Sequence, residues 1–242
     1  MQPIAEVAKS VVERILSRPF GPEISDAELE RREKLRETAR RANEAHELIG
    51  VIGARYESCT VASFDLSGTE AAVKAKRDAV ERVKAFGKGL REQVDAGANL
   101  FIYGPPGTGK DHLMVALMLH AIRGHGIRVK WCNGQTLFGD FRDNIDRDVS
   151  ERALLSKYTN PEVLAISDPV PPKGEISAYA SGMLYRIVDE RYRRNKPTWV
   201  TVNVSKSDDA VKELSGPIYD RLVDGALTVF CNWPSHRQSR KQ

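Results

Sequence analysis

The sequence predicts an α/β fold in which a five-stranded, mainly parallel sheet lies between helices, with a helical N-terminal extension before it. From about residue 98, short apolar runs alternate with stretches of helical periodicity, the pattern of parallel strands joined by crossover helices. A glycine-rich loop follows the first apolar run directly. The expected strands are Leu100–Tyr103, Val129–Cys132, Val163–Ile166, Trp199–Val202 and Leu227–Cys231.

Three helices are expected before the sheet. The first is short and ends at the Pro-Gly-rich segment Arg18–Pro22, and a second runs from the N-cap Ser25 to about Ile49, with Glu28 placed as in a capping box. Its mixed charges favour a solvated helix, with a nucleic-acid surface as the alternative. After a connector over 50–70, Ala71–Val94 is expected to be a third, amphipathic helix. The apolar face of the first helix is Val7, Val11, Val12 and Ile15.

The composition is that of a globular protein large enough to bury a core. Hydrophobic residues make up 41% and charged residues 29% of the 242 residues, and the net charge of +4 permits nucleic-acid contact without arguing for it. No run approaches the ~20 apolar residues of a membrane span, and the N-terminus lacks signal-peptide features. Three scattered cysteines give neither a zinc pattern nor a disulfide framework, so we expect a cytoplasmic protein.

The loop Gly104–Asp111 has the order strand, glycine-rich turn and helix that phosphate-binding loops require. Its backbone N–H groups and the start of the helix that follows would surround phosphate oxygens, and Lys110 would add a full positive charge. This predicts ATP binding. His112 is more typical of a structural helix residue than of a catalyst. The candidate nucleotide-binding residues are Gly104, Pro105, Pro106, Gly107, Thr108, Gly109, Lys110, Asp111 and His112.

These and later motifs resemble the DnaC/IstB group of AAA+ ATPases, which are helicase loaders and transposition helpers. The resemblance covers roughly residues 55–240, and residues 1–54 match nothing that we can name. It therefore implies an AAA+ ATPase domain over 55–242 with a minimal lid, and a separate extension over 1–54. The motifs are Gly104–His112, Val163–Asp168, Arg191–Thr198, Val200–Asn203, Asp220–Leu222 and Trp233–Arg237.

The resemblance also implies roles for three polar residues. Asn203 corresponds to the sensor that orients the attacking water, with a strand-end turn residue as the alternative. Arg221 corresponds to the arginine finger that reaches the γ-phosphate of a neighbouring subunit, and Arg237 resembles the second sensor. For both arginines the alternative is a structural or surface side chain.

The acidic motif at the third strand has two alignments. In the one that we prefer, Ser167 takes the first acidic position and Asp168 the second, which makes Asp168 the catalytic carboxylate. In the other, Asp168 is the first acid and Pro169 the second, and no catalytic carboxylate is left. The preferred alignment fits the four preceding apolar residues without a shift.

The loop and this strand together suggest an exchange of Mg²⁺-binding groups. A phosphate loop usually carries Ser or Thr where this chain has Asp111, and the strand usually carries Asp where this chain has Ser167. One hydroxyl and one carboxylate would still face the ion, with Asp168 nearby as the third candidate ligand. The alternative is that both positions have decayed, so that ATP binds but is hydrolysed poorly.

The function implied by the resemblance is an ATP-dependent loader or remodeller of a replicative helicase, acting on single-stranded DNA as an ATP-dependent homo-oligomer. Two alternatives stay open. One is a transposition helper that acts on a transposase and duplex DNA. The other is a nucleotide-gated adaptor with little hydrolysis.

Overall fold

The computed structural model describes residues 25–143, 150–170 and 176–237. The first expected helix, around Val7 to Ile15, lies outside these residues. The chain divides into two compact units, Met1–Arg40 and Arg41–Gln242. This division falls earlier than the boundary after residue 54 that the sequence suggested.

Helix α2 (Asp26–Ile52) begins where its cap was expected. The hydroxyl of Ser25 accepts a hydrogen bond from the backbone N–H of Glu28 at 3.3 Å. Towards the other end of the helix, Ala45, Leu48 and Ile49 are buried in the core of the second unit. The last turns of α2 are therefore part of the globular body, which explains why the body extends further toward the N-terminus than the motifs do.

The single helix expected over Ala71–Val94 is wrong, because two helices occupy this segment. They are α3 (Glu70–Lys88) and α4 (Leu90–Asp95), and they are separated at Gly89, whose φ of −105° and ψ of 34° are not helical. The hydroxyl of Thr69 caps α3 by accepting the N–H of Ala72. Glycine favours such breaks because it loses more conformational entropy than other residues when it is fixed in a helix. A short 3₁₀ helix, η1 (Ala54–Tyr56), precedes α3.

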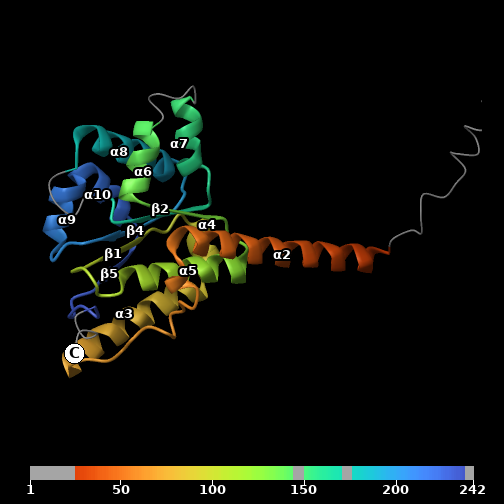
Figure 1. The fold of residues 1–242 in the computed structure, drawn as a ribbon, viewed down its shortest axis with the longest axis horizontal. Coiled ribbons are helices and arrows are strands. Elements are labelled where there is room, and N and C mark those ends of the chain that lie inside the picture. Colours follow the sequence, from red (N-terminus) through yellow and green to blue (C-terminus); the bar gives the residue numbers. More distant parts are fainter. Residues whose placement is uncertain (1–24, 144–149, 171–175, 238–242) are drawn as a thin grey trace, which may run out of the picture. The chain divides into compact units, whose positions relative to one another are not determined.

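The described residues form one five-stranded sheet in the order β2-β3-β4-β1-β5. Every pairing in it is parallel, so the predicted fold class is confirmed (Figure 1). Parallel neighbours require crossover connections, which the helices supply. The strands are β1 (Leu100–Tyr103), β2 (Val129–Asn133), β3 (Val163–Ser167), β4 (Thr198–Val202) and β5 (Leu227–Phe230).

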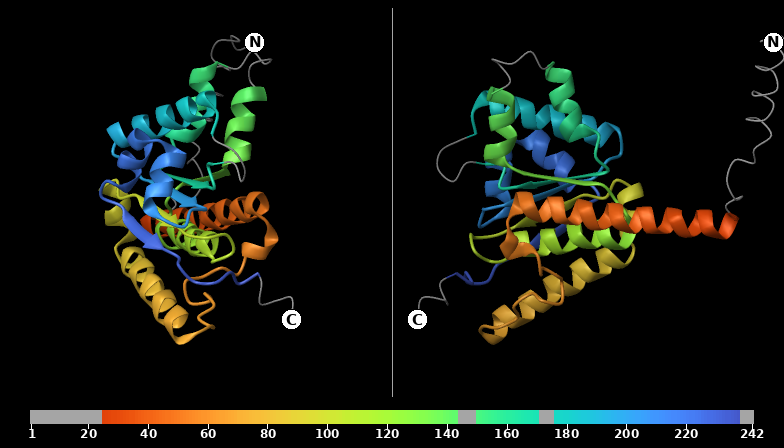
Figure 2. Two further views of the ribbon diagram at one scale, coloured as in Figure 1. Left: turned by 90° about the vertical axis from the view of Figure 1, so that its left-hand side faces the viewer. Right: turned by 45° about the vertical axis from the view of Figure 1, so that its right-hand side comes forward.

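Helices cover both faces of this sheet (Figures 1 and 2). Strand residues alternate between two cores. Leu100 and Ile102 join the core with α2, α3, α4 and the helix that follows β1, while Phe101 joins the core with the helices that follow β2. None of the described helices is long and apolar enough to cross a membrane. The helices not yet given are α5 (Lys110–His125), α6 (Gly134–Asp143), α7 (Glu151–Thr159), α8 (Ala178–Arg193), α9 (Ser207–Leu214) and α10 (Gly216–Val223).

Candidate nucleotide site

The glycine-rich loop connects β1 to α5 at the carboxyl edge of the sheet, and its glycines are required sterically. At Gly104, with φ of 151°, a Cβ would lie 2.4 Å from the carbonyl oxygen of Cys231. At Gly107, with φ of 82°, a Cβ would lie 2.0 Å from the hydroxyl of Ser235. Only glycine fits both the backbone conformation and the space. The loop can therefore turn its N–H groups inward as phosphate binding requires.

Lys110 is the first residue of α5 and is only 5% exposed. Its ammonium group donates to the carbonyl oxygens of Gly104 and Pro105, both at 2.9 Å, and to Oδ1 of Asn203 at 2.7 Å. Burial lowers the pKa of Lys110, and the charge of Asp168 counters this in part. No carboxylate is bonded to Lys110 within the described residues, and a buried cation of this kind favours a nearby anion.

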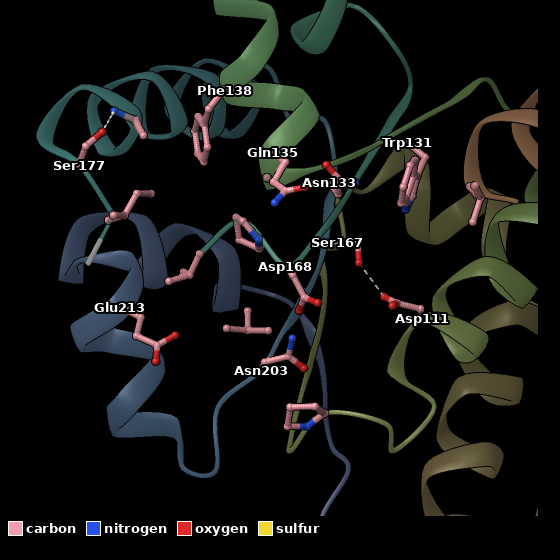
Figure 3. A pocket seen from close by; sticks show the side chains of 18 of the residues that line it. Asp111, Trp131, Asn133, Gln135, Phe138, Ser167, Asp168, Ser177, Asn203 and Glu213 are labelled. Atoms are coloured by element: carbon pink, nitrogen blue, oxygen red, sulfur yellow. Dashed lines mark hydrogen bonds between the residues drawn. The ribbon is translucent and has the colours of Figure 1, made fainter. Parts of the chain in front are cut away.

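The carboxylate of Asp111 and the hydroxyl of Ser167 lie side by side. Ser167, the last residue of β3, donates to Oδ1 of Asp111 at 2.8 Å (Figure 3). A third side chain joins them, because the hydroxyl of Thr201 donates to the same oxygen at 2.9 Å. No role for Thr201 was predicted from the sequence. A threonine two positions before Asn203 is no distinctive signal, because the same strand also contains Thr198.

Asp168 follows β3 directly and has a left-handed backbone with φ of 45°. Its Oδ1 is buried and accepts no hydrogen bond within the described residues. Burial raises the pKa of Asp168, and the nearby charge of Asp111 raises it further. Strained backbone, an unpartnered carboxylate oxygen and a raised pKa are typical of functional sites. The unpartnered oxygen beside a second carboxylate also fits a position next to a divalent cation.

Asp111, Ser167, Asp168 and Asn203 line a cavity of about 750 Å³ at the carboxyl edge of the sheet. Figure 3 shows Asp111, Ser167, Asp168 and Asn203 gathered on one side of it, with Gln135 and Phe138 on α6 lying beyond them. Four aromatic rings contribute to its wall, those of Tyr56, Trp131, Phe138 and Tyr179. The cavity is larger than a phosphate group needs.

The segment after β5 closes over the loop. The indole N–H of Trp233 donates to the carbonyl oxygen of Thr108 at 2.8 Å. The backbone N–H of His236 donates to the carbonyl oxygen of Gly107 at 2.9 Å. The side chain of Arg237 lies near the same loop, with its Cδ 3.6 Å from where a Cβ on Gly107 would be. Arg237 is therefore brought to the candidate site.

His112 is not among the residues that line the cavity. Its Nε2 lies 2.9 Å from the carbonyl oxygen of Thr60, and its Nδ1 lies 3.4 Å from Sγ of Cys59. Its ring also meets the edge of Phe64. The imidazole thus links α5 to the connector. The group of His112 that remains available to a phosphate is its backbone N–H.

Arg221 lies on α10, away from the loop of its own chain. Its carbonyl oxygen accepts from the side chain of Asn99, which immediately precedes β1, whereas the phosphate loop follows the other end of that strand. Its guanidinium is paired with Asp189 at 3.0 Å and lies over the rings of Tyr185 and Tyr192. Arg221 is therefore not part of the site formed within one chain.

Residues 60–242 match the family described as IstB-like ATP binding protein. The replicative helicase loader DnaC of Escherichia coli is 30% identical over 150 residues, which are 60% of this chain and 59% of that protein. An ATP-binding protein assigned to an insertion sequence of Mycobacterium tuberculosis is 27% identical over 156 residues, 61% of this chain and 59% of that protein. The chain thus spans about three fifths of these curated relatives.

Solved structures show the same fold. A crystal structure of the DnaC helicase loader has a TM-score of 0.64 at 20% identity, over 74% of this chain and 99% of that chain. The replication initiator DnaA bound to AMPPCP and single-stranded DNA has a TM-score of 0.57 at 20% identity, over 74% of this chain and 50% of that chain. With an AAA+-type P-loop fold and a family match over most of its length, this chain belongs to the IstB-like ATP-binding protein family.

Proposed function

We propose that the chain binds ATP with Mg²⁺ at Gly104–Asp111 and hydrolyses it. The observation that carries this is the arrangement of Lys110, whose ammonium is bonded to two loop carbonyls and to Asn203 at the edge of the cavity. Phosphate oxygens would replace these neutral acceptors with charged ones, which hydrogen-bond more strongly. The proposed phosphate-binding groups are the loop N–H groups and Lys110.

Asp111, Ser167 and Asp168 are the proposed metal-side residues. Mg²⁺ takes oxygen ligands, keeps several waters and neutralises charge on the β and γ phosphates. The pairing of Asp111 with Ser167 supports the exchange of carboxylate and hydroxyl between loop and strand. The unpartnered oxygen of Asp168 supports its place beside them.

The proposed catalytic residues would act on the attacking water and on the charge of the phosphates. Asp168 would accept a proton from the attacking water, and its raised pKa favours that role. Asn203 would orient the same water once Lys110 turns to the phosphates. Arg237, which lies near the loop, would add positive charge there, as the second sensor does in the resembling group.

Arg221 is proposed to act on the ATP of a neighbouring copy. Its distance along β1 from its own loop and its partial exposure, 24% of the side chain, support action between chains rather than within one. A site completed by a second copy requires a homo-oligomer. ATP between the two copies would favour its assembly.

The proposed biological role is that of a DnaC-like helicase loader or remodeller, working in the cytoplasm on a replicative helicase and single-stranded DNA. The similarity to DnaC and the fold shared with DnaA support it. A transposition helper that acts on a transposase and duplex DNA is the second candidate. It is favoured by the family match and by the insertion-sequence relative.

Residues 1–54 are proposed to hold the partner protein. The structure sharpens the test, because Ala45, Leu48 and Ile49 belong to the core of the second unit and should be kept. A chain that starts at Arg41 should fold, bind ATP and retain salt-sensitive DNA binding, but no longer co-purify with the host helicase. Helicase binding that survives this truncation would remove the arm from the proposal.

Turnover is the direct test of the proposed activity. ATP hydrolysis should be measured alone, with single-stranded DNA and with duplex DNA, using Lys110→Ala as the inactive control. Stimulation by single strands supports the loader, and stimulation by duplex DNA supports the helper. Absence of turnover above the control under all three conditions would leave only the nucleotide-gated adaptor.

A further inference from the structure

Thr201 is a fully buried polar residue next to the metal side of the proposed site, with an exposed fraction of 0%. It lies in the middle of the sheet, opposite Ile102 on β1 and Ser167 on β3. Apolar residues occupy most of the surrounding core. A hydroxyl in such a place costs stability unless it forms a hydrogen bond.

The hydroxyl of Thr201 makes its short contact with Oδ1 of Asp111, at 2.9 Å. It also lies 3.4 Å from the hydroxyl of Ser167, which donates to that same oxygen at 2.8 Å. Two donors therefore engage Oδ1 from two adjacent strands. Within the described residues, Oδ2 of Asp111 accepts no hydrogen bond.

This arrangement divides the two oxygens of one carboxylate between two tasks. Hydrogen bonds to an ionised group are stronger than those between neutral groups, so two of them hold the side chain firmly. A ligand group that is already held does not have to be ordered when the cation binds. The oxygen that is left over is then the one available to Mg²⁺.

We infer that Thr201 is a positioning residue for the metal side of the site: with Ser167 it anchors Oδ1 of Asp111 and so presents Oδ2 to the cation. This rests on the proposed binding of ATP with Mg²⁺ and adds to it a strand residue that no phosphate-loop pattern would select. If Thr201 were purely structural, it would only fill space in the sheet, and a valine of the same shape could take its place.

The test is the affinity of the full-length protein for a fluorescent ATP analogue, measured with Mg²⁺ and in excess EDTA. Thr201→Val keeps the shape and removes the donor, so the ratio of the two affinities should fall about tenfold. Thr201→Ser keeps the hydroxyl and should stay within about twofold of the wild type. Thr201→Cys, with only a weak donor, serves if the valine variant does not fold.

Thr198→Val is the matched control, because Thr198 is a buried threonine on the same strand whose hydroxyl accepts from Arg191. It should lower stability without changing the Mg²⁺ ratio. In an Asp111→Ala background, Thr201→Val should no longer change the ratio, since the carboxylate that it anchors is gone.

An unchanged ratio in a folded Thr201→Val protein that still binds the analogue would overturn the inference, and so would an equal fall in Thr198→Val. These outcomes are distinct from failure of the proposed function. In that case the wild type itself would not bind the analogue, or Lys110→Ala would bind it equally well.

Discussion

Lys110 and Arg191 are both buried cations, and they differ in the acceptors to which their N–H groups donate. Arg191, which is 0% exposed, packs at the end of the sheet where β4 begins, and its three guanidinium nitrogens all donate within the chain. Lys110 is held at the opposite, carboxyl edge by three acceptors beside a cavity. The acceptors of Arg191 are the hydroxyl of Thr198 and the carbonyl oxygens of Tyr158, Thr159, Pro161, Glu162 and Pro197.

The difference distinguishes a structural cation from one that we propose to bind a ligand. Arg191 joins the end of α7, the turn into β3 and the start of β4, so any exchange of its partners would break the fold. Two acceptors of Lys110 belong to its own loop, and the third is the side chain of an exposed residue, Asn203. Phosphate oxygens can take over those contacts. Burial also lowers the pKa of Arg191 to about 9, and its carbonyl partners supply no full negative charge.

Removing Arg191 should therefore have the largest effect on stability. Arg191→Met leaves buried carbonyls unpartnered, and we expect a loss of about 4 kcal/mol in the free energy of unfolding, measured by urea denaturation. Lys110→Met should cost less than about 1.5 kcal/mol in the same assay, because it relieves the burial of a charge. Equal losses in the free energy of unfolding of the two variants would contradict the distinction between the two cations.

Arg221 is intermediate between Arg191 and Lys110. Its guanidinium has a carboxylate partner and contacts two aromatic rings, but its side chain remains partly exposed. An arginine supplied by a neighbouring subunit can contribute about 10³ or more in rate, so Arg221→Ala should lower ATP turnover by about that factor. Turnover per subunit should rise with protein concentration in the wild type.

Mixing gives the control for this prediction. Arg221→Ala subunits retain the loop, and Lys110→Ala subunits retain the arginine, so the mixture should recover part of the activity. No recovery, together with a rate per subunit that does not depend on concentration, argues that Arg221 is only structural.

Asp111→Ala should weaken ATP binding about tenfold in Mg²⁺ and much less in EDTA, because it removes a proposed metal ligand. Nucleotide titrations under the two conditions measure this. The double variant Asp111→Thr with Ser167→Asp should regain the Mg²⁺ effect, because it restores the usual arrangement. If Asp111→Ala binds ATP with Mg²⁺ as the wild type does, the exchange is incorrect.

The smallest effect on binding is expected for His112→Ala. Its ring contacts the connector through Thr60 and Cys59, so the variant should keep the ATP affinity within about twofold and lose about 1 kcal/mol of stability. Calorimetric titration and urea denaturation on the same sample separate these quantities. A large loss of affinity at unchanged stability would assign the imidazole to the nucleotide.

The strands and the loop were predictable because their signals are local. Apolar runs and glycine spacing place each strand within about a residue of its observed ends, and the shared carboxyl edge predicts that Asp111 and Ser167 meet. Their metal role stays a prediction. Gly89 is different, since the predicted helix contains two glycines, Gly87 and Gly89, and each is compatible with either a continuous or a broken helix.

The roles of Arg191 and Thr201 could not be predicted, because they depend on contacts far apart in the sequence. Arg191 reads as one of several basic residues at the end of a helix, yet four of its six acceptors come from residues about 30 positions earlier. Thr201 reads as a strand threonine, and its partner Asp111 lies 90 positions away. Only the assembled sheet brings such pairs together.

We propose above all that Lys110 binds the phosphates of ATP, and calorimetric titration of ATP with Mg²⁺ into the wild type and Lys110→Ala tests this most directly. We expect the variant to bind at least about tenfold more weakly, because a charge-assisted contact is lost. Its urea denaturation should stay close to that of the wild type. Unchanged affinity in the folded variant would contradict the claim.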